Sequence, residues 1–65
     1  MSRRQDLLDR LPGKYHAQFA RGTDLADSLS RVEDAVEYEM LGRRGDAWLA
    51  RTRAWVRTER RELEG

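Results

Sequence analysis

The chain has 65 residues and no cysteine, so we expect one small domain held together without disulfides or thiolate metal sites. Charged residues make up 38% of the sequence, but the formal net charge is only +1. This balance excludes a uniformly basic nucleic-acid coat and an acidic disordered tail. A core this small contributes only a few kcal/mol, so closely packed helices or a homodimer must supply the stability.

The first ten residues, MSRRQDLLDR, are basic but contain no apolar run long enough for a signal peptide. No segment approaches the roughly 20 apolar residues that a membrane-spanning helix needs. We therefore expect a cytoplasmic protein that makes no contact with a membrane.

Residues 1–22 are expected to form an N-terminal helical segment that is interrupted at Pro12. Ser2 is a typical N-cap residue, and proline disfavours a helical conformation in the residue before it, so a first helix ends near Pro12. Pro12 suits the first turn of a second piece, which runs to Gly22, a candidate left-handed helix stop. The sequence leaves open whether the segment is one kinked helix or two short ones.

Residues 23–42 are expected to form an acidic helix, capped by Thr23 or Asp24 and ended by Gly42 or Gly45. Apolar residues recur there at steps of three and four, which places them on one helical face. These residues are Leu25, Leu29, Val32, Val36 and Met40.

Residues 46–64 are expected to form an Arg-rich helix that begins after the cap Asp46. Its core-facing side holds Trp48, Leu49, Thr52, Trp55, Val56, Glu59 and Leu63, with Glu59 interrupting the apolar face. We interpret the two tryptophans as core anchors, although their seven-residue spacing also suits a coiled-coil seam between two protomers.

The pattern predicts an all-α fold in which residues 1–65 form a single domain of three to four helices. The two long helices, joined by GRRG, form an antiparallel hairpin, and the N-terminal helical segment packs across it. No stretch shows the alternating pattern of a strand.

The stretch LADSLSRVEDAV, residues 25–36, has the apolar spacing of a helix-turn-helix DNA-binding motif. Ser30 and Arg31 stand where the turn of such a motif carries glycine and an apolar residue. Its second helix would also present Glu33, Asp34 and Glu37 to the phosphates, which repel them. One uninterrupted helix explains the same spacing, and we favour it.

The charges are segregated along the chain. Residues 22–42 contain six acids and one arginine, whereas residues 43–65 contain seven arginines and four acids. We expect an acidic face formed by Asp27, Asp34 and Glu37, and a basic face formed by Arg43, Arg44, Arg53, Arg57, Arg60 and Arg61. Like charges four residues apart cost about 0.2–0.5 kcal/mol per pair. Either the two helices neutralise each other, within the hairpin or across a dimer, or one face binds a partner.

Tyr38 and Leu41 project from the acidic helix on the side away from its apolar face. We favour the interpretation that the N-terminal segment covers them. The alternative is that they lie in an interface with a partner, where tyrosine is enriched.

No motif in the chain indicates catalysis. His16 is the only histidine, and GRRGD lacks the Lys-Ser/Thr ending of a phosphate-binding loop. We therefore predict a protein that is not an enzyme and has no catalytic residue, cofactor or metal.

These observations favour a small regulator or inhibitor that acts by protein–protein interaction. Phages and mobile elements encode such proteins, for example inhibitors of a nuclease or a defence complex. One alternative is a dimeric nucleic-acid-binding regulator that uses the Arg-rich helix. A second alternative is a structural helical subunit of a larger assembly.

Overall fold

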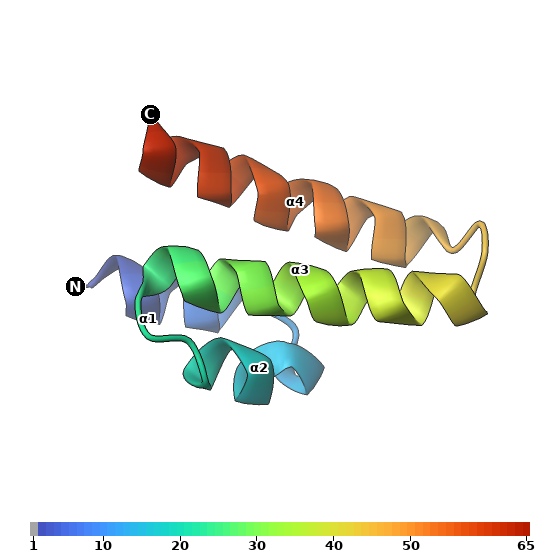
Figure 1. Ribbon diagram of the computed structural model, residues 1–65, viewed down its shortest axis with the longest axis horizontal. Helices are drawn as coiled ribbons and strands as arrows, with labels where there is room; N and C mark the ends of the chain where they lie inside the picture. The colour runs from blue at the N-terminus through green and yellow to red at the C-terminus, as the bar shows by residue number, and fades with distance from the viewer. Residues whose placement is uncertain (1) are drawn as a thin grey trace.

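The computed structural model describes residues 2–65, and every regular element among them is helical (Figure 1). In chain order these are α1 (Arg3–Arg10), the 3-10 helix η1 (Gly13–Tyr15), α2 (His16–Ala20), α3 (Leu25–Gly42) and α4 (Ala47–Glu64). Helices α3 and α4 form an antiparallel hairpin, α2 lies along α3 on the side away from α4, and α1 passes behind α3 (Figure 1). The predicted all-α hairpin with an N-terminal segment packed across it is confirmed.

The N-termini of the long elements are fixed by their caps. The side chains of Ser2, Asp24 and Asp46 each accept a hydrogen bond from the backbone N–H three residues further on, at 3.1, 2.8 and 3.1 Å. Such bonds satisfy donors that have no partner inside the helix. Asp24, and not Thr23, is therefore the cap of α3, which ends at Gly42.

Helix α3 continues without interruption from Leu25 to Gly42. No turn separates Ser30 from Arg31, so the helix-turn-helix interpretation is excluded and the single helix is confirmed. None of the helices within residues 2–65 has both the length and the apolar character required to cross a bilayer.

The N-terminal segment consists of two short helical pieces with Pro12 between them, rather than one kinked helix. The expectation that Gly22 adopts a left-handed conformation is wrong, since Gly45, at φ 80°, is the one residue of the described chain with positive φ. Gly22 instead lies directly against α3. A Cβ atom there would come within 2.0 Å of Ser28 Oγ and 2.4 Å of Ser28 Cα, so the close approach of the two backbones requires glycine.

All the larger elements contribute to the core. The apolar face predicted for α3 is buried at its centre, and the N-terminal segment supplies four of the nine buried apolar residues. These nine are Leu7, Leu11, Tyr15, Phe19, Leu29, Val32, Val36, Leu49 and Val56. The prediction that both tryptophans are core anchors is wrong for Trp48, which is 41% exposed, whereas Trp55 is half-buried against the core.

Candidate functional site

An ion-pair cluster joins α3 to α4. Glu33 is buried, with 6% of its surface exposed, and its carboxylate accepts hydrogen bonds from Arg57 Nε at 2.8 Å and from Arg60. Glu37 accepts from Arg57 Nη2 at 3.3 Å and lies 3.6 Å from Arg53 Nη1. Three members of the predicted basic face, Arg53, Arg57 and Arg60, therefore lie against carboxylates of α3.

The pKa values of this cluster keep it ionised. Burial raises the pKa of Glu33, but the hydrogen bonds from Arg57 and Arg60 outweigh burial and leave it below its usual value. The hydrogen bond to Glu33 raises the pKa of Arg57 in turn. Repulsion between like charges along each helix is thus offset by attraction across the hairpin, which is the neutralisation expected from the segregated charges.

The remaining arginines of the predicted basic face do not form one surface. Arg43 lies 3.9 Å from Asp46, its neighbour in the connecting loop. Arg44 and Arg61 are exposed and form no ion pair within residues 2–65. The structure therefore breaks the predicted six-arginine face into paired and unpaired members.

The predicted acidic face is divided in a similar way. Asp27 accepts hydrogen bonds from the Thr23 backbone N–H and from Arg31 Nε, both at 3.0 Å, and these two bonds lower its pKa. Glu37 is turned toward α4. Asp34 is exposed and is the one member of this face that forms no ion pair in the described chain, although Arg21 and Arg31 line the same hollow.

Tyr38 and Leu41 lie uncovered on the solvent side of α3, with 79% and 75% of their surfaces exposed. The favoured interpretation, that the N-terminal segment covers them, is wrong. The segment is held on another side of α3, where Lys14 Nζ lies 2.7 Å from Glu39 Oε2 and Gly22 lies against Ser28.

A second buried acid, Glu59, explains the interruption predicted in the apolar face of α4. It is 6% exposed and accepts hydrogen bonds from Arg10 Nη1 at 3.3 Å and Arg3 Nη2 at 3.5 Å. Both arginines come from α1, so Glu59 ties the N-terminal helix to the hairpin. Sequence reasoning did not find these partners, because nothing local marks residues so distant in the chain as neighbours.

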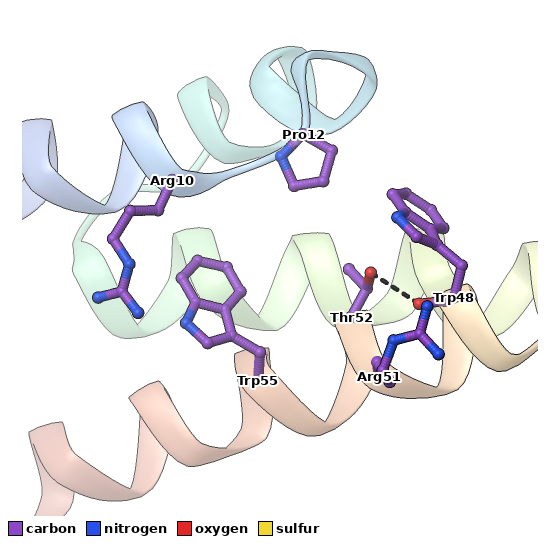
Figure 2. A pocket seen from close by; sticks show the side chains of 6 residues that line it. All are labelled: Arg10, Pro12, Trp48, Arg51, Thr52 and Trp55. Carbon is purple, nitrogen blue, oxygen red and sulfur yellow. Dashed lines mark hydrogen bonds between the residues drawn. The ribbon is translucent and has the colours of Figure 1, made fainter.

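A groove that sequence reasoning missed runs between α4 and the chain around Pro12 (Figure 2). It has a volume of about 320 Å³ and is lined by Arg10, Pro12, Trp48, Arg51, Thr52 and Trp55. Both indole rings project from α4 toward Pro12, with Thr52 between them along the helix (Figure 2). The seven-residue spacing of the tryptophans was the available signal, but it was interpreted as core packing.

The two indole rings that line the groove are each in contact with a second side chain. The Arg10 guanidinium lies over the ring of Trp55, 5.3 Å from its centroid. The ring of Tyr15 stacks with Trp48 at 6.3 Å and an interplanar angle of 18°. Burial, together with the neighbouring Glu39 carboxylate, raises the pKa of Tyr15 to about 12.

The remaining polar groups give no sign of a metal centre. Within residues 2–65, no three acidic or histidine side chains converge as a metal-ligand group. His16, the one histidine, places Nε2 2.9 Å from the Leu11 carbonyl oxygen and so helps to fix the turn after α1. Comparison of the chain with protein-family models, with characterised proteins and with solved structures finds no match.

Proposed function

We propose that this protein is a small non-enzymatic regulator that binds another protein through the outer face of α3. The observation that carries the proposal is the exposure of Tyr38 and Leu41. The two residues are three apart on one helix, so their side chains form a single apolar patch. Tyrosine is enriched in protein interfaces and among the residues that contribute most of their binding energy.

The charge around this patch indicates the chemistry of the partner. Asp34 precedes Tyr38 by four residues and Leu41 by seven, and therefore lies on the same face of α3. Arg31 and Arg43 also lie near the patch, but they are paired with Asp27 and Asp46. Asp34 is therefore the charge that remains for a basic group of the partner. We expect an apolar pocket rimmed by lysine or arginine, since complementary charge favours fast and specific association.

We further propose that binding through α3 inhibits the partner by blocking its surface. We expect the patch on α3 to cover a functional surface of its partner, as a phage-encoded inhibitor of a nuclease or defence complex does. A symmetric pair formed through α3 is disfavoured, because it would place two copies of Asp34 on one interface with no added cation, while Arg31 is already paired with Asp27. This face therefore fits a different protein better than a second copy of the chain.

Nucleic-acid binding has less support. Arg53, Arg57 and Arg60 donate to or lie beside carboxylates of α3, so breaking those pairs would cost part of any phosphate affinity. We expect light scattering to give the same molar mass for the protein with and without a short random DNA duplex at low salt. A complex that dissociates as salt rises would favour the Arg-rich helix instead.

Site-specific photo-crosslinking in a lysate of the source organism tests the α3 face. A photoreactive benzoylphenylalanine replaces Gly42, an exposed residue of α3 that lines the same hollow as Tyr38 and Leu41, in one protein and the exposed Thr58 on α4 in a matched control. We expect the α3 position to yield an adduct of one defined mass, which disappears when Tyr38→Ser and Leu41→Ser are added. No adduct from α3, or one that persists in the double variant, would overturn the proposal.

A further inference from the structure

The groove between α4 and the chain around Pro12 shares no residue with the patch on α3. We propose that it binds an extended acidic segment of a partner protein that carries two prolines. In this arrangement the prolines pack against Trp48 and Trp55, and an adjacent carboxylate of the segment pairs with Arg51. The inference concerns a second binding site and does not depend on the function proposed for α3.

The two tryptophans offer preformed apolar walls. Trp48 keeps a large part of its surface exposed, although it stacks on Tyr15, and Trp55 is held under the Arg10 guanidinium. Rings that are fixed before binding lose little conformational freedom when a ligand arrives. Proline-rich segments in the polyproline II conformation bind aromatic-lined grooves for the same reason, since they too are already ordered.

The spacing of the walls matches such a segment. Seven residues of α-helix separate the two tryptophans, which corresponds to a rise of about 10.5 Å along α4. In a polyproline II helix, residues three apart point to the same side and are separated by about 9.3 Å. A Pro-x-x-Pro segment lying along α4 would therefore bring one proline to each indole.

The charge of the groove selects an acidic ligand. Its lining contains two arginines and no acid. Arg10 is already engaged by Glu59, whereas Arg51 is exposed and forms no ion pair within the described residues. Thr52 Oγ1 donates to the Trp48 carbonyl oxygen at 2.9 Å, so its hydroxyl proton is not available to a ligand. The free Arg51 guanidinium is thus the group best placed to receive a carboxylate.

The size of the groove also favours a peptide. Its volume of about 320 Å³ is at the small end of the range for ligand sites, and it is open along one side. A hollow of this size accommodates one or two side chains of a longer segment rather than a whole cofactor.

Intrinsic fluorescence provides a direct test, because the chain has two tryptophans and both line the groove. The probe is the peptide Glu-Pro-Asp-Glu-Pro-Glu, titrated into the full-length protein. We expect a saturable change in tryptophan emission with a Kd below about 1 mM. Two control peptides replace both prolines with alanine, or every acid with lysine, and each should bind at least tenfold more weakly. Equal binding of either control would overturn the assigned chemistry, as would the absence of a saturable change.

Two charge-reversal variants locate the binding site. Arg51→Glu should weaken binding of the acidic peptide at least tenfold. Arg61 is also exposed and lies on α4 outside the groove, and it forms no ion pair within the described residues, so Arg61→Glu should change binding less than twofold. Both variants should keep the circular dichroism spectrum of the parent protein. Equal weakening by the two substitutions would show a response to net charge alone and would overturn the site.

Discussion

The two long sides of α4 carry the same kinds of residue, but one side is paired with its neighbouring helix and the other is partly open to solvent. On the side facing α3, Arg57 and Arg60 are paired with the buried Glu33. On the side facing the N-terminal segment, Glu59 is satisfied near the C-terminal end of α4, but the N-terminal half leaves Trp48 and Arg51 open to solvent. The difference arises from the neighbouring element, since α3 supplies carboxylates along its length and the segment around Pro12 supplies none to the groove.

This contrast shows that an Arg-rich helix does not by itself indicate a phosphate-binding surface. The role of each arginine depends on which element packs beside it. Arg57 stabilises the hairpin, whereas Arg51, six residues earlier on the same helix, is free to meet a ligand. The contrast also predicts that variants on the two sides of α4 will affect different properties.

The largest effect on stability is expected from Gly22→Ala, which disrupts the packing of the N-terminal segment against α3. The new methyl group would collide with the backbone and hydroxyl of Ser28, and α2 would have to move away from α3. We expect a loss of at least about 3 kcal/mol in the free energy of unfolding, at the upper end of the cost of overpacking. Urea denaturation followed by far-UV circular dichroism measures this loss.

Gly13→Ala is the matched control for this substitution. A Cβ atom at Gly13 would have no neighbour within 4 Å, so the unfolding midpoint should change little. If the two substitutions had equal effects, the close approach between Gly22 and α3 would not be what holds the segment in place.

A smaller effect is expected from Glu33→Gln, which disrupts the side of α4 that faces α3. The glutamine retains the shape of the side chain but removes the carboxylate that Arg57 and Arg60 share, and only Arg57 keeps another, that of Glu37. We expect a loss of about 1–3 kcal/mol at neutral pH, the range for hydrogen bonds to charged groups. Asp34→Asn removes an exposed, unpaired carboxylate of the same helix and should change stability by less than about 0.5 kcal/mol.

Glu33→Gln should also alter the dependence of stability on pH. The pKa of Glu33 is lower in the folded protein than its ordinary value of 4.5, so its stabilising contribution is complete above about pH 4.5. That contribution is lost as the pH falls through the folded-state value, where the carboxylate becomes protonated. The parent protein should therefore lose stability more steeply in acid than Glu33→Gln. Equal slopes for the two proteins would contradict the assigned pKa shift.

Most of the local structure could be predicted from the sequence, because caps and helical periodicity depend on neighbouring residues. Ser2 and Asp46 marked the starts of α1 and α4, and the spacing of Leu29, Val32 and Val36 marked the buried face of α3. These predictions hold because the residues recognised in the sequence are the ones that form the capping bonds and the core contacts.

The candidate sites were harder to predict, because they depend on how each helix is rotated against its neighbours. A shift of one residue on a helical wheel turns a side chain by about 100°. Nothing local therefore showed that Arg57 faces Glu33, that Lys14 pairs with Glu39, or that Trp48 remains exposed. Sequence reasoning explained Gly22 by its conformational freedom. In the structure, glycine is required because a Cβ atom at this position would collide with Ser28.

The smallest effects are expected from removing single arginines, and these effects compare the two sides of α4 most directly. Arg57→Ala breaks the ion pairs with Glu33 and Glu37, but its guanidinium is half-exposed and the pairs are partly screened by solvent. We expect a loss of about 1 kcal/mol in the free energy of unfolding, near the upper limit for exposed pairs. Arg51→Ala breaks no ion pair in the described chain, so the unfolding free energy should change by less than about 0.5 kcal/mol. Raising the salt concentration should shrink the loss for Arg57→Ala and leave Arg51→Ala unaffected, because salt screens charges that are paired near the surface. If Arg51→Ala lost as much stability as Arg57→Ala, both sides of α4 would depend on their arginines for folding. Arg51 would then be engaged within the protein and would not be free to bind a ligand.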